Sequence, residues 1–249
     1  APLYRLRPAL RPCRGDRPAG LPDPGSRPDF VSQGTFSGGA PVDGYVLDDL
    51  QAYPGEDFSA VLFRFQGPGA EGAPQVPAFV AELRDWPPRV RLTFHGVRGT
   101  ELEPTDLAGL SRTLPLVREA VVERPLDDSA VELVLYLSAP ALFRAYGGEG
   151  GVGLDLKPHH APPADVFAVR VLSDGPLGPG EPALALAQEV RSAGFPGEVL
   201  ATTDPRIVAV EAGAYGSEAE ALSVSASMER AGFRVRVDRR GSLDLPAPR

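Results

Sequence analysis

The sequence predicts two domains: an all-β sandwich, then an α+β domain whose elements run β-α-β-β-α-β around an antiparallel four-stranded sheet. Three observations predict this fold class. Two similar series of short segments with alternating apolar and polar residues fill positions 45–157. A proline-rich stretch at 157–164 follows them. From 165 to 240, strand patterns alternate with two helical patterns, and each helical pattern runs into Ala-Gly-Phe.

Composition excludes several function classes. The 249 residues carry a formal net charge of −8, and an acidic chain repels phosphate backbones, so no nucleic-acid partner is expected. Cys13 is the single cysteine, which excludes a disulfide framework. No run of 18 apolar residues occurs, so no transmembrane segment is expected.

The first domain, residues 31–156, is expected to be the sandwich. Its clearest strand is 89–96, where Val, Leu and Phe alternate with Arg and Thr. Short strands with turn-rich joins are typical of antiparallel sandwiches. A helix is expected over 103–114, with Thr105 as its cap. The strand segments, in order, are 45–51, 59–66, 78–83, 89–96, 116–123, 130–138, 141–146 and 152–157.

The second domain, residues 165–240, is expected to hold two helices, at 181–194 and 217–232. The second helix begins with a capping box, because Ser217 is followed three residues later by Glu220. Both helical patterns end at a glycine, the residue that tolerates the left-handed conformation found after helix C-termini. The strands are expected at 166–173, 197–201, 206–213 and 233–237.

Three further segments lack apolar periodicity. Residues 1–30 are rich in proline and arginine, which predicts a disordered arm. Residues 157–164 contain three prolines in eight positions and are expected to be a linker. Residues 241–249 are expected to be a tail.

The second half of the 165–240 segment combines a valine-rich strand, a glycine, a small residue, an aromatic residue and a capped helix. This order resembles the sporulation-related repeat (SPOR) domain, a bacterial module that binds peptidoglycan glycan strands lacking stem peptides. The chain departs from the family at Arg170, where glutamine is usual, and at Ala209, where arginine is common. The matching residues are Gly213, Ala214, Tyr215, Ser217, Glu218, Ala219 and Ala231-Gly232-Phe233.

The first domain carries a second resemblance. Residues 81–96 contain a strand, a Trp-Pro-Pro turn and an alternating strand, and residues 141–157 contain two strands joined by glycines. Both segments resemble the AMIN domain, the β-sandwich that places cell-wall amidases and pilus secretins in the bacterial envelope. No catalytic domain follows it, as one would in an amidase.

Strand alternation in the second domain sends one set of side chains to the helices and the other to an open sheet face. Arginine and carboxylate side chains on an open face can bind sugar hydroxyl and acetamido groups. The alternative is an ordinary solvated face, with ion pairs such as Glu211 with Arg170 or Arg234. The SPOR resemblance favours glycan binding. The predicted glycan-binding residues are Arg170, Leu172, Glu211, Arg234 and Arg236.

No catalytic residue, metal site or cofactor is expected. His159 and His160 are adjacent in the predicted linker and point apart, while His95 belongs to another element. Three histidines, two of them in a linker, give little support to a serine or cysteine hydrolase.

The expected function is therefore that of a non-catalytic bacterial cell-envelope protein, located in the periplasm. Its SPOR-like domain would bind denuded peptidoglycan glycan strands during cell division or wall maintenance. The alternative is a protein-interaction subunit of an envelope assembly, such as a pilus or secretin complex, with other envelope proteins as partners. An enzyme that acts through the first domain is the least supported hypothesis.

Overall fold

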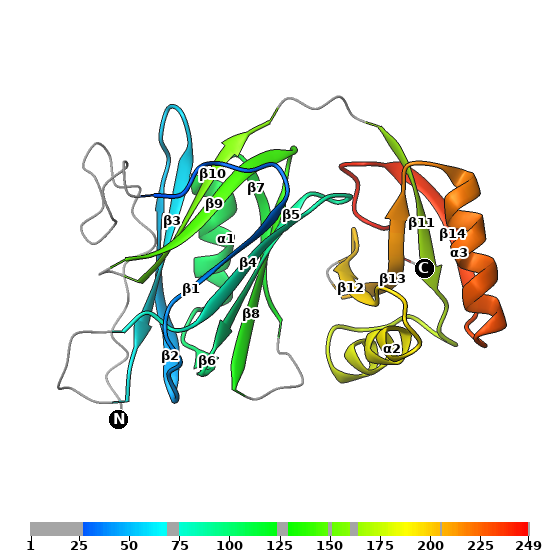
Figure 1. Ribbon diagram of the computed structural model, residues 1–249, viewed down its shortest axis with the longest axis horizontal. Coiled ribbons are helices and arrows are strands. Elements are labelled where there is room, and N and C mark those ends of the chain that lie inside the picture. The colour runs from blue at the N-terminus through cyan, green and yellow to red at the C-terminus, as the bar shows by residue number, and fades with distance from the viewer. Residues whose placement is uncertain are drawn as a thin grey trace. The chain divides into compact units, whose positions relative to one another are not determined.

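A computed structural model describes residues 27–68, 75–123, 129–148, 151–159, 164–204 and 206–248. The chain divides into two compact units (Figure 1). The first unit is Ala1–Arg84 with Pro88–His160, and the second is Asp85–Pro87 with Ala161–Arg249. No helix within the described residues is long and apolar enough to cross a membrane.

The first unit contains two five-stranded sheets, in the orders β1-β4-β5-β8-β7 and β6-β2-β3-β10-β9. The inner side chains of both sheets form one apolar core. The strands are β1 (Gly34–Gly38), β2 (Tyr45–Tyr53), β3 (Ser59–Gln66), β4 (Phe79–Arg84), β5 (Arg89–His95), β6 (Val97–Thr100), β7 (Val117–Glu123), β8 (Ala130–Leu137), β9 (Ala141–Gly148) and β10 (Gly151–Pro158).

The alternation in β5 places its apolar side chains in this core. Val90, Leu92 and Phe94 are fully buried, as a strand with one face toward the core requires. Phe94 also joins the two sheets, because its ring centroid lies 5.6 Å from that of Phe63 on β3. The strand predicted at 89–96 is therefore confirmed over Arg89–His95.

Helix α1 (Pro104–Thr113) lies against β7 of one sheet and β2 of the other. Its N-cap is Glu103 in a capping box with Asp106, so the expected cap at Thr105 is wrong. Proline at the first helical position explains the difference, because it fixes φ for helix entry and places the cap at Glu103, two positions before Thr105. Leu110 is fully buried, so the helix covers part of the core.

A buried ion cluster fixes the start of the described chain to the outer side of β9 and β10. Asp155 on β10 is 0% exposed, and its Oδ2 accepts hydrogen bonds from Arg144 Nε at 2.7 Å and Arg27 Nη1 at 3.0 Å. Its Oδ1 accepts one from the Tyr146 hydroxyl at 2.8 Å. The Arg144 guanidinium also lies over the ring of Phe30, 4.2 Å from its centroid. This Asp155 cluster uses both carboxylate oxygens, as a buried charge requires.

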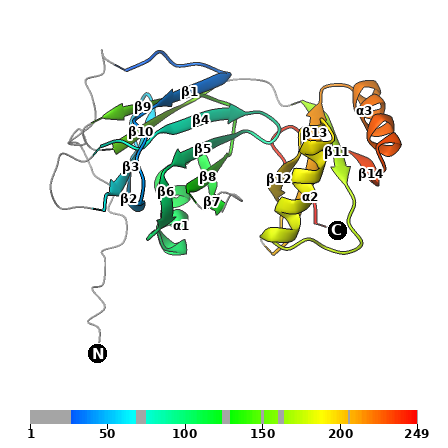
Figure 2. The same ribbon diagram turned by 60° about the horizontal axis from the view of Figure 1, so that its bottom comes forward.

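The second unit has one four-stranded sheet, in the order β12-β13-β11-β14, with antiparallel pairing throughout. Two helices pack on one of its faces (Figure 2). α2 contacts β12 and β13, and α3 contacts β11, β13 and β14. The elements are β11 (Asp165–Val171), α2 (Glu181–Ser192), β12 (Glu198–Ala201), β13 (Val208–Tyr215), α3 (Glu218–Arg230) and β14 (Val235–Gly241).

Side-chain sidedness in this sheet follows the predicted alternation. Val169 on β11 and Val210 on β13 are fully buried against the helices. Ser217 caps α3, where its hydroxyl oxygen accepts a hydrogen bond from the Glu220 backbone N–H, as the capping-box pattern predicted. The alternate strand residues on the helix-covered face belong to this core or pack against it: Phe167, Val169, Val171, Val208, Val210, Phe233, Val235 and Val237.

The predicted fold class, an all-β domain followed by a small α+β SPOR-like domain, is wrong. The structure is 49% strand and 17% helix, with three sheets of four or five strands and three helices within the described residues. The first unit is not all-β, because α1 packs on its core. Its described part also has ten strands where eight were expected. β1 and β6 were missed because they are short and rich in glycine, serine and threonine, without a clear alternation.

Two predicted segments differ in extent from what the structure describes. Lys157 and Pro158, expected in the linker, end β10, while 160–163 lie outside the described residues. Of the predicted disordered arm, 1–30, residues 1–26 lie outside the described residues. Beyond it, Val31 pairs with Phe143 on β9 through two backbone hydrogen bonds.

Candidate functional site

The structure brings three of the five predicted glycan-binding residues together on the sheet face opposite the helices. Arg170 on β11 lies opposite Glu211 on β13 and opposite Arg236 on β14. Residues directly opposite each other in antiparallel strands point their side chains to the same face of the sheet, where these side chains are neighbours. The three charged groups therefore form one row across the sheet.

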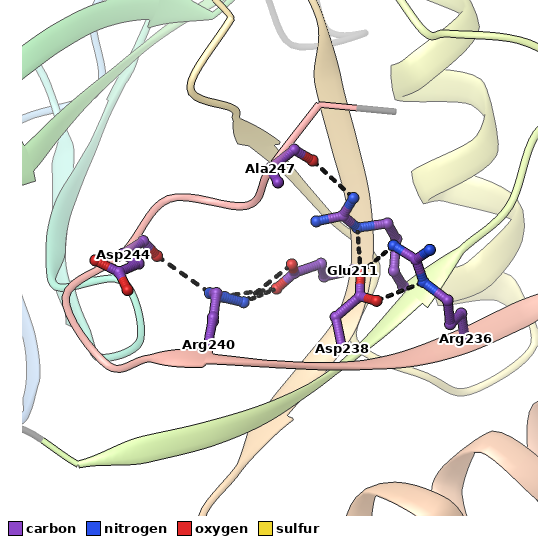
Figure 3. A network of polar contacts seen from close by, with 7 residues as sticks. Glu211, Arg236, Asp238, Arg240, Asp244 and Ala247 are labelled. Carbon is purple, nitrogen blue, oxygen red and sulfur yellow. Dashed lines mark hydrogen bonds and ion pairs between the residues drawn. The ribbon is translucent and has the colours of Figure 1, made fainter.

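These charges are held in an ion-pair network (Figure 3). Asp238 on β14 pairs with Arg170, Nε to Oδ2 at 3.2 Å, and accepts a hydrogen bond from Arg236 Nη2 at 2.8 Å. Arg170 is only 5% exposed, whereas about half of the Arg236 side chain is accessible. The network therefore fixes one arginine inside and positions the other at the surface.

A second pair lies beside the first. Arg240 donates from Nη1 to Glu211 Oε1 at 3.1 Å and from Nη2 to Oε2 at 3.0 Å, a two-pronged geometry that only guanidinium provides. Asp238 and Arg240 were missed by sequence reasoning, which ended this strand at position 237. The sequence did carry a signal for a longer strand, because Arg236, Asp238 and Arg240 are charged residues at alternate positions, and such positions share one face of a strand.

The C-terminal segment 242–248 crosses this face. The Ala247 carbonyl accepts a hydrogen bond from Arg170 Nη1 at 2.8 Å, and the Asp244 carbonyl accepts one from Arg240 Nε at 3.1 Å (Figure 3). The Pro246 carbonyl accepts the Thr203 backbone N–H at 3.1 Å. The predicted tail is therefore part of the site, and the expected open face is covered at Arg170.

The two remaining predicted residues lie at the end of the same strands. Leu172 follows β11, is half-buried, and its backbone N–H donates to the Arg234 carbonyl at 2.7 Å. Arg234 is exposed, and its Nη1 donates to Asp174 Oδ1 at 2.7 Å. Arg234 and Arg236 are thus the two predicted donors whose guanidinium groups reach the surface.

A small cavity of about 190 Å³ adjoins the network within the second unit. Arg170 and Ala247 are among the residues that line it. Its walls also include Leu172, Ser173, Leu177 and Thr202. Apolar walls with a few fixed polar groups are typical of small-ligand sites.

The outer face of the first unit carries a separate carboxylate pair. Glu123 on β7 lies opposite Glu132 on β8, and the two carboxyl groups share a hydrogen bond. Burial, together with the Glu132 charge, raises the pKa of Glu123 to about 7, although the charge of Arg91 opposes this. Arg91 Nε lies 2.9 Å from Glu132 Oε1. The pair can therefore hold one proton near neutral pH.

Metal-ligating side chains are dispersed in the part of the chain that the structure describes. No group of three or more His, Cys, Asp or Glu side chains converges there in a geometry that could hold a metal ion. His95 ends β5 and His159 follows β10, while His160 lies outside the described residues.

No protein-family model matches the chain, and no curated protein matches it in sequence.

Proposed function

We propose that the chain is a non-catalytic protein of the bacterial cell envelope that binds denuded peptidoglycan glycan strands through the second unit. Arg234 and Arg236 are the primary donors to sugar oxygens. The ligand in this proposal is the one implied by the sequence resemblance of residues 165–240 to the SPOR family. The predicted fold class is not part of the proposal. Cell division or wall maintenance in the periplasm is the setting in which denuded strands arise.

The observation that carries the proposal is the preorganisation of the exposed Arg236 guanidinium group by a buried network. Asp238 holds Arg236, and the buried Arg170 in turn holds Asp238. Guanidinium groups make several directed hydrogen bonds and stay charged, which suits the hydroxyl and acetamido oxygens of glycan. Donors fixed before binding lose less side-chain entropy when they bind.

The role assigned to Arg170 changes accordingly. Its contacts with Asp238 and the Ala247 carbonyl make it a positioning residue rather than a free donor. An alanine at this position would leave Asp238 without its buried partner, and would therefore weaken the fold as well as binding. Substitutions at Arg234 and Arg236 are the cleaner test.

Arg234→Ala combined with Arg236→Ala is expected to reduce binding to amidase-treated sacculi by about tenfold or more. Loss of a charged hydrogen bond typically costs about 1.5–3 kcal/mol, and about 1.4 kcal/mol is tenfold in affinity. Co-sedimentation measures the bound fraction. Both side chains are exposed, so the circular dichroism spectrum should not change.

The matched control is Arg206→Ala. Arg206 is also an exposed arginine paired with an aspartate, Asp204, but it lies in the turn between β12 and β13. It should pellet like the unsubstituted chain. Equal loss for the control and the double variant would mean that net charge, not the β14 arginines, determines binding.

A further inference from the structure

Residues 243–248 cross the sheet face of the second unit that carries the row of charged groups (Figure 3). Arg240 on β14 donates a hydrogen bond from Nε to the Asp244 carbonyl at 3.1 Å. Arg170 on β11 donates one from Nη1 to the Ala247 carbonyl at 2.8 Å. Two guanidinium groups of the candidate site therefore hold backbone carbonyls of their own chain. We call residues 243–248 the strap.

The strap is attached as a hydrogen-bond acceptor and not as a further strand. The Pro246 carbonyl accepts the backbone N–H of Thr203, which follows β12, at 3.1 Å. Pro246 and Pro248 have no backbone N–H, so the strap cannot form the regular hydrogen-bond ladder of a strand. Its contacts with Arg170, Arg240 and Thr203 all use carbonyl oxygens of the strap.

The chain is anchored just before the strap begins. The Ser242 backbone N–H donates to the Ala164 carbonyl at 2.8 Å, and the Ser242 hydroxyl oxygen accepts the Ala164 N–H at 3.2 Å. Ser242 is 6% exposed. These bonds hold the end of β14 beside the start of β11 without help from the strap. The strap can therefore leave the sheet face while the sheet itself stays intact.

The donors that hold the strap also suit the proposed ligand. Peptide carbonyls and the acetamido groups of glycan both present an amide oxygen to a guanidinium group. While the strap is bound, Arg170 is only 5% exposed and its Nη1 is occupied by the Ala247 carbonyl. About half of the Arg236 side chain stays accessible. A glycan strand can therefore reach Arg236 at once, but it reaches Arg170 only in place of the strap.

We infer that the strap is an autoinhibitory segment, which occupies Arg170 and Arg240 with its own carbonyls until glycan displaces it. This inference rests on the proposed glycan binding and adds a regulation to it. The strap belongs to the same chain, so its effective concentration at the sheet face is high, and a few hydrogen bonds suffice for competition. A face that is open in about one molecule of ten binds its ligand about tenfold more weakly than a permanently open face does.

Pro246→Gly in the full chain loosens the strap and leaves every donor of the sheet in place. Pro246 is buried, and glycine in its place gives the released strap more conformational freedom, which favours release. We expect this variant to bind denuded sacculi about fivefold or more tightly than the unsubstituted chain, as co-sedimentation measures. The matched control is Pro54→Gly, at an exposed proline that follows β2 in the first unit. It should bind like the unsubstituted chain.

A chain that stops after Ser242 lacks the strap altogether. The deletion of 243–249 removes one aspartate and one arginine, so the net charge does not change. We expect this chain to bind denuded sacculi at least as tightly as Pro246→Gly does. Circular dichroism establishes that each variant is folded.

Hydrogen exchange at the Thr203 amide measures strap release without any ligand, because the Pro246 carbonyl protects this N–H. Exchange should be faster in Pro246→Gly than in the unsubstituted chain. Faster exchange with unchanged glycan binding would overturn the inference and leave the proposed function in place, and so would weaker binding by either strap variant. If none of the chains pellets with denuded sacculi, the proposed function fails, and the inference fails with it.

Discussion

Asp155→Ala is expected to destabilise the first unit by about 3–5 kcal/mol, the range for breaking a buried ion pair by removing one partner. Asp155 is 0% exposed and satisfies three donors, from Arg27, Arg144 and Tyr146. Its removal takes the buried Asp155 carboxylate away from two guanidinium groups and from the Tyr146 hydroxyl. The loss of stability therefore comes mainly from these three buried donors, which lose their acceptor.

Urea-induced unfolding followed by circular dichroism measures this change. The control is Asp43→Ala, which breaks the pair of Asp43 with Arg98 in the same unit, where both side chains are largely exposed. Its expected effect is below about 1 kcal/mol. If the two variants unfold at the same urea concentration, the Asp155 cluster does not anchor the unit.

The stability of the first unit is expected to fall between about pH 4.5 and pH 7 through Glu123. Its pKa rises from 4.5 to about 7 on folding, mainly because burial disfavours the charged carboxylate. Between these values the folded chain binds the proton more tightly than the unfolded chain does. Stability therefore decreases as pH increases, by on the order of 3 kcal/mol, and levels off above about pH 7.

Glu123→Gln removes this dependence, because glutamine stays neutral. The variant should match the unsubstituted chain near pH 4.5 and exceed its stability at pH 8, as measured by urea unfolding at both values. Glu56→Gln, at an exposed position before β3, should leave the pH profile unchanged. A Glu123→Gln profile parallel to that of the unsubstituted chain would contradict the assignment.

The alternation of apolar and polar residues predicted those strands that keep one face buried and the other face more exposed along their whole length. β5 buries its alternate apolar residues Val90, Leu92 and Phe94, and the helix-facing side of the second unit's sheet was assigned correctly. β1 and β6 were not predicted, because short strands rich in glycine and hydroxyl residues resemble turns. The fold class failed for the same reason: local patterns do not reveal how many short segments complete each sheet.

For the candidate site, the sequence predicted which residues lie on the sheet face, but not how they are buried or paired. Alternation placed Arg170, Glu211 and Arg236 on one face, and the register bears this out. It could not show that Arg170 is covered, because its hydrogen bond to Ala247 joins residues 77 positions apart. Nor could it show the choice of partners, in which Arg170 pairs with Asp238 rather than Glu211. Both features depend on the path of segment 242–248.

Peptidoglycan binding is tested most directly by co-sedimentation of the full chain with purified sacculi, before and after an amidase removes the stem peptides. We expect the chain to pellet with denuded sacculi and to stay mainly in solution with untreated ones, because free glycan oxygens are the proposed acceptors for Arg234 and Arg236. Equal pelleting with both preparations, or with neither, would contradict the proposed function.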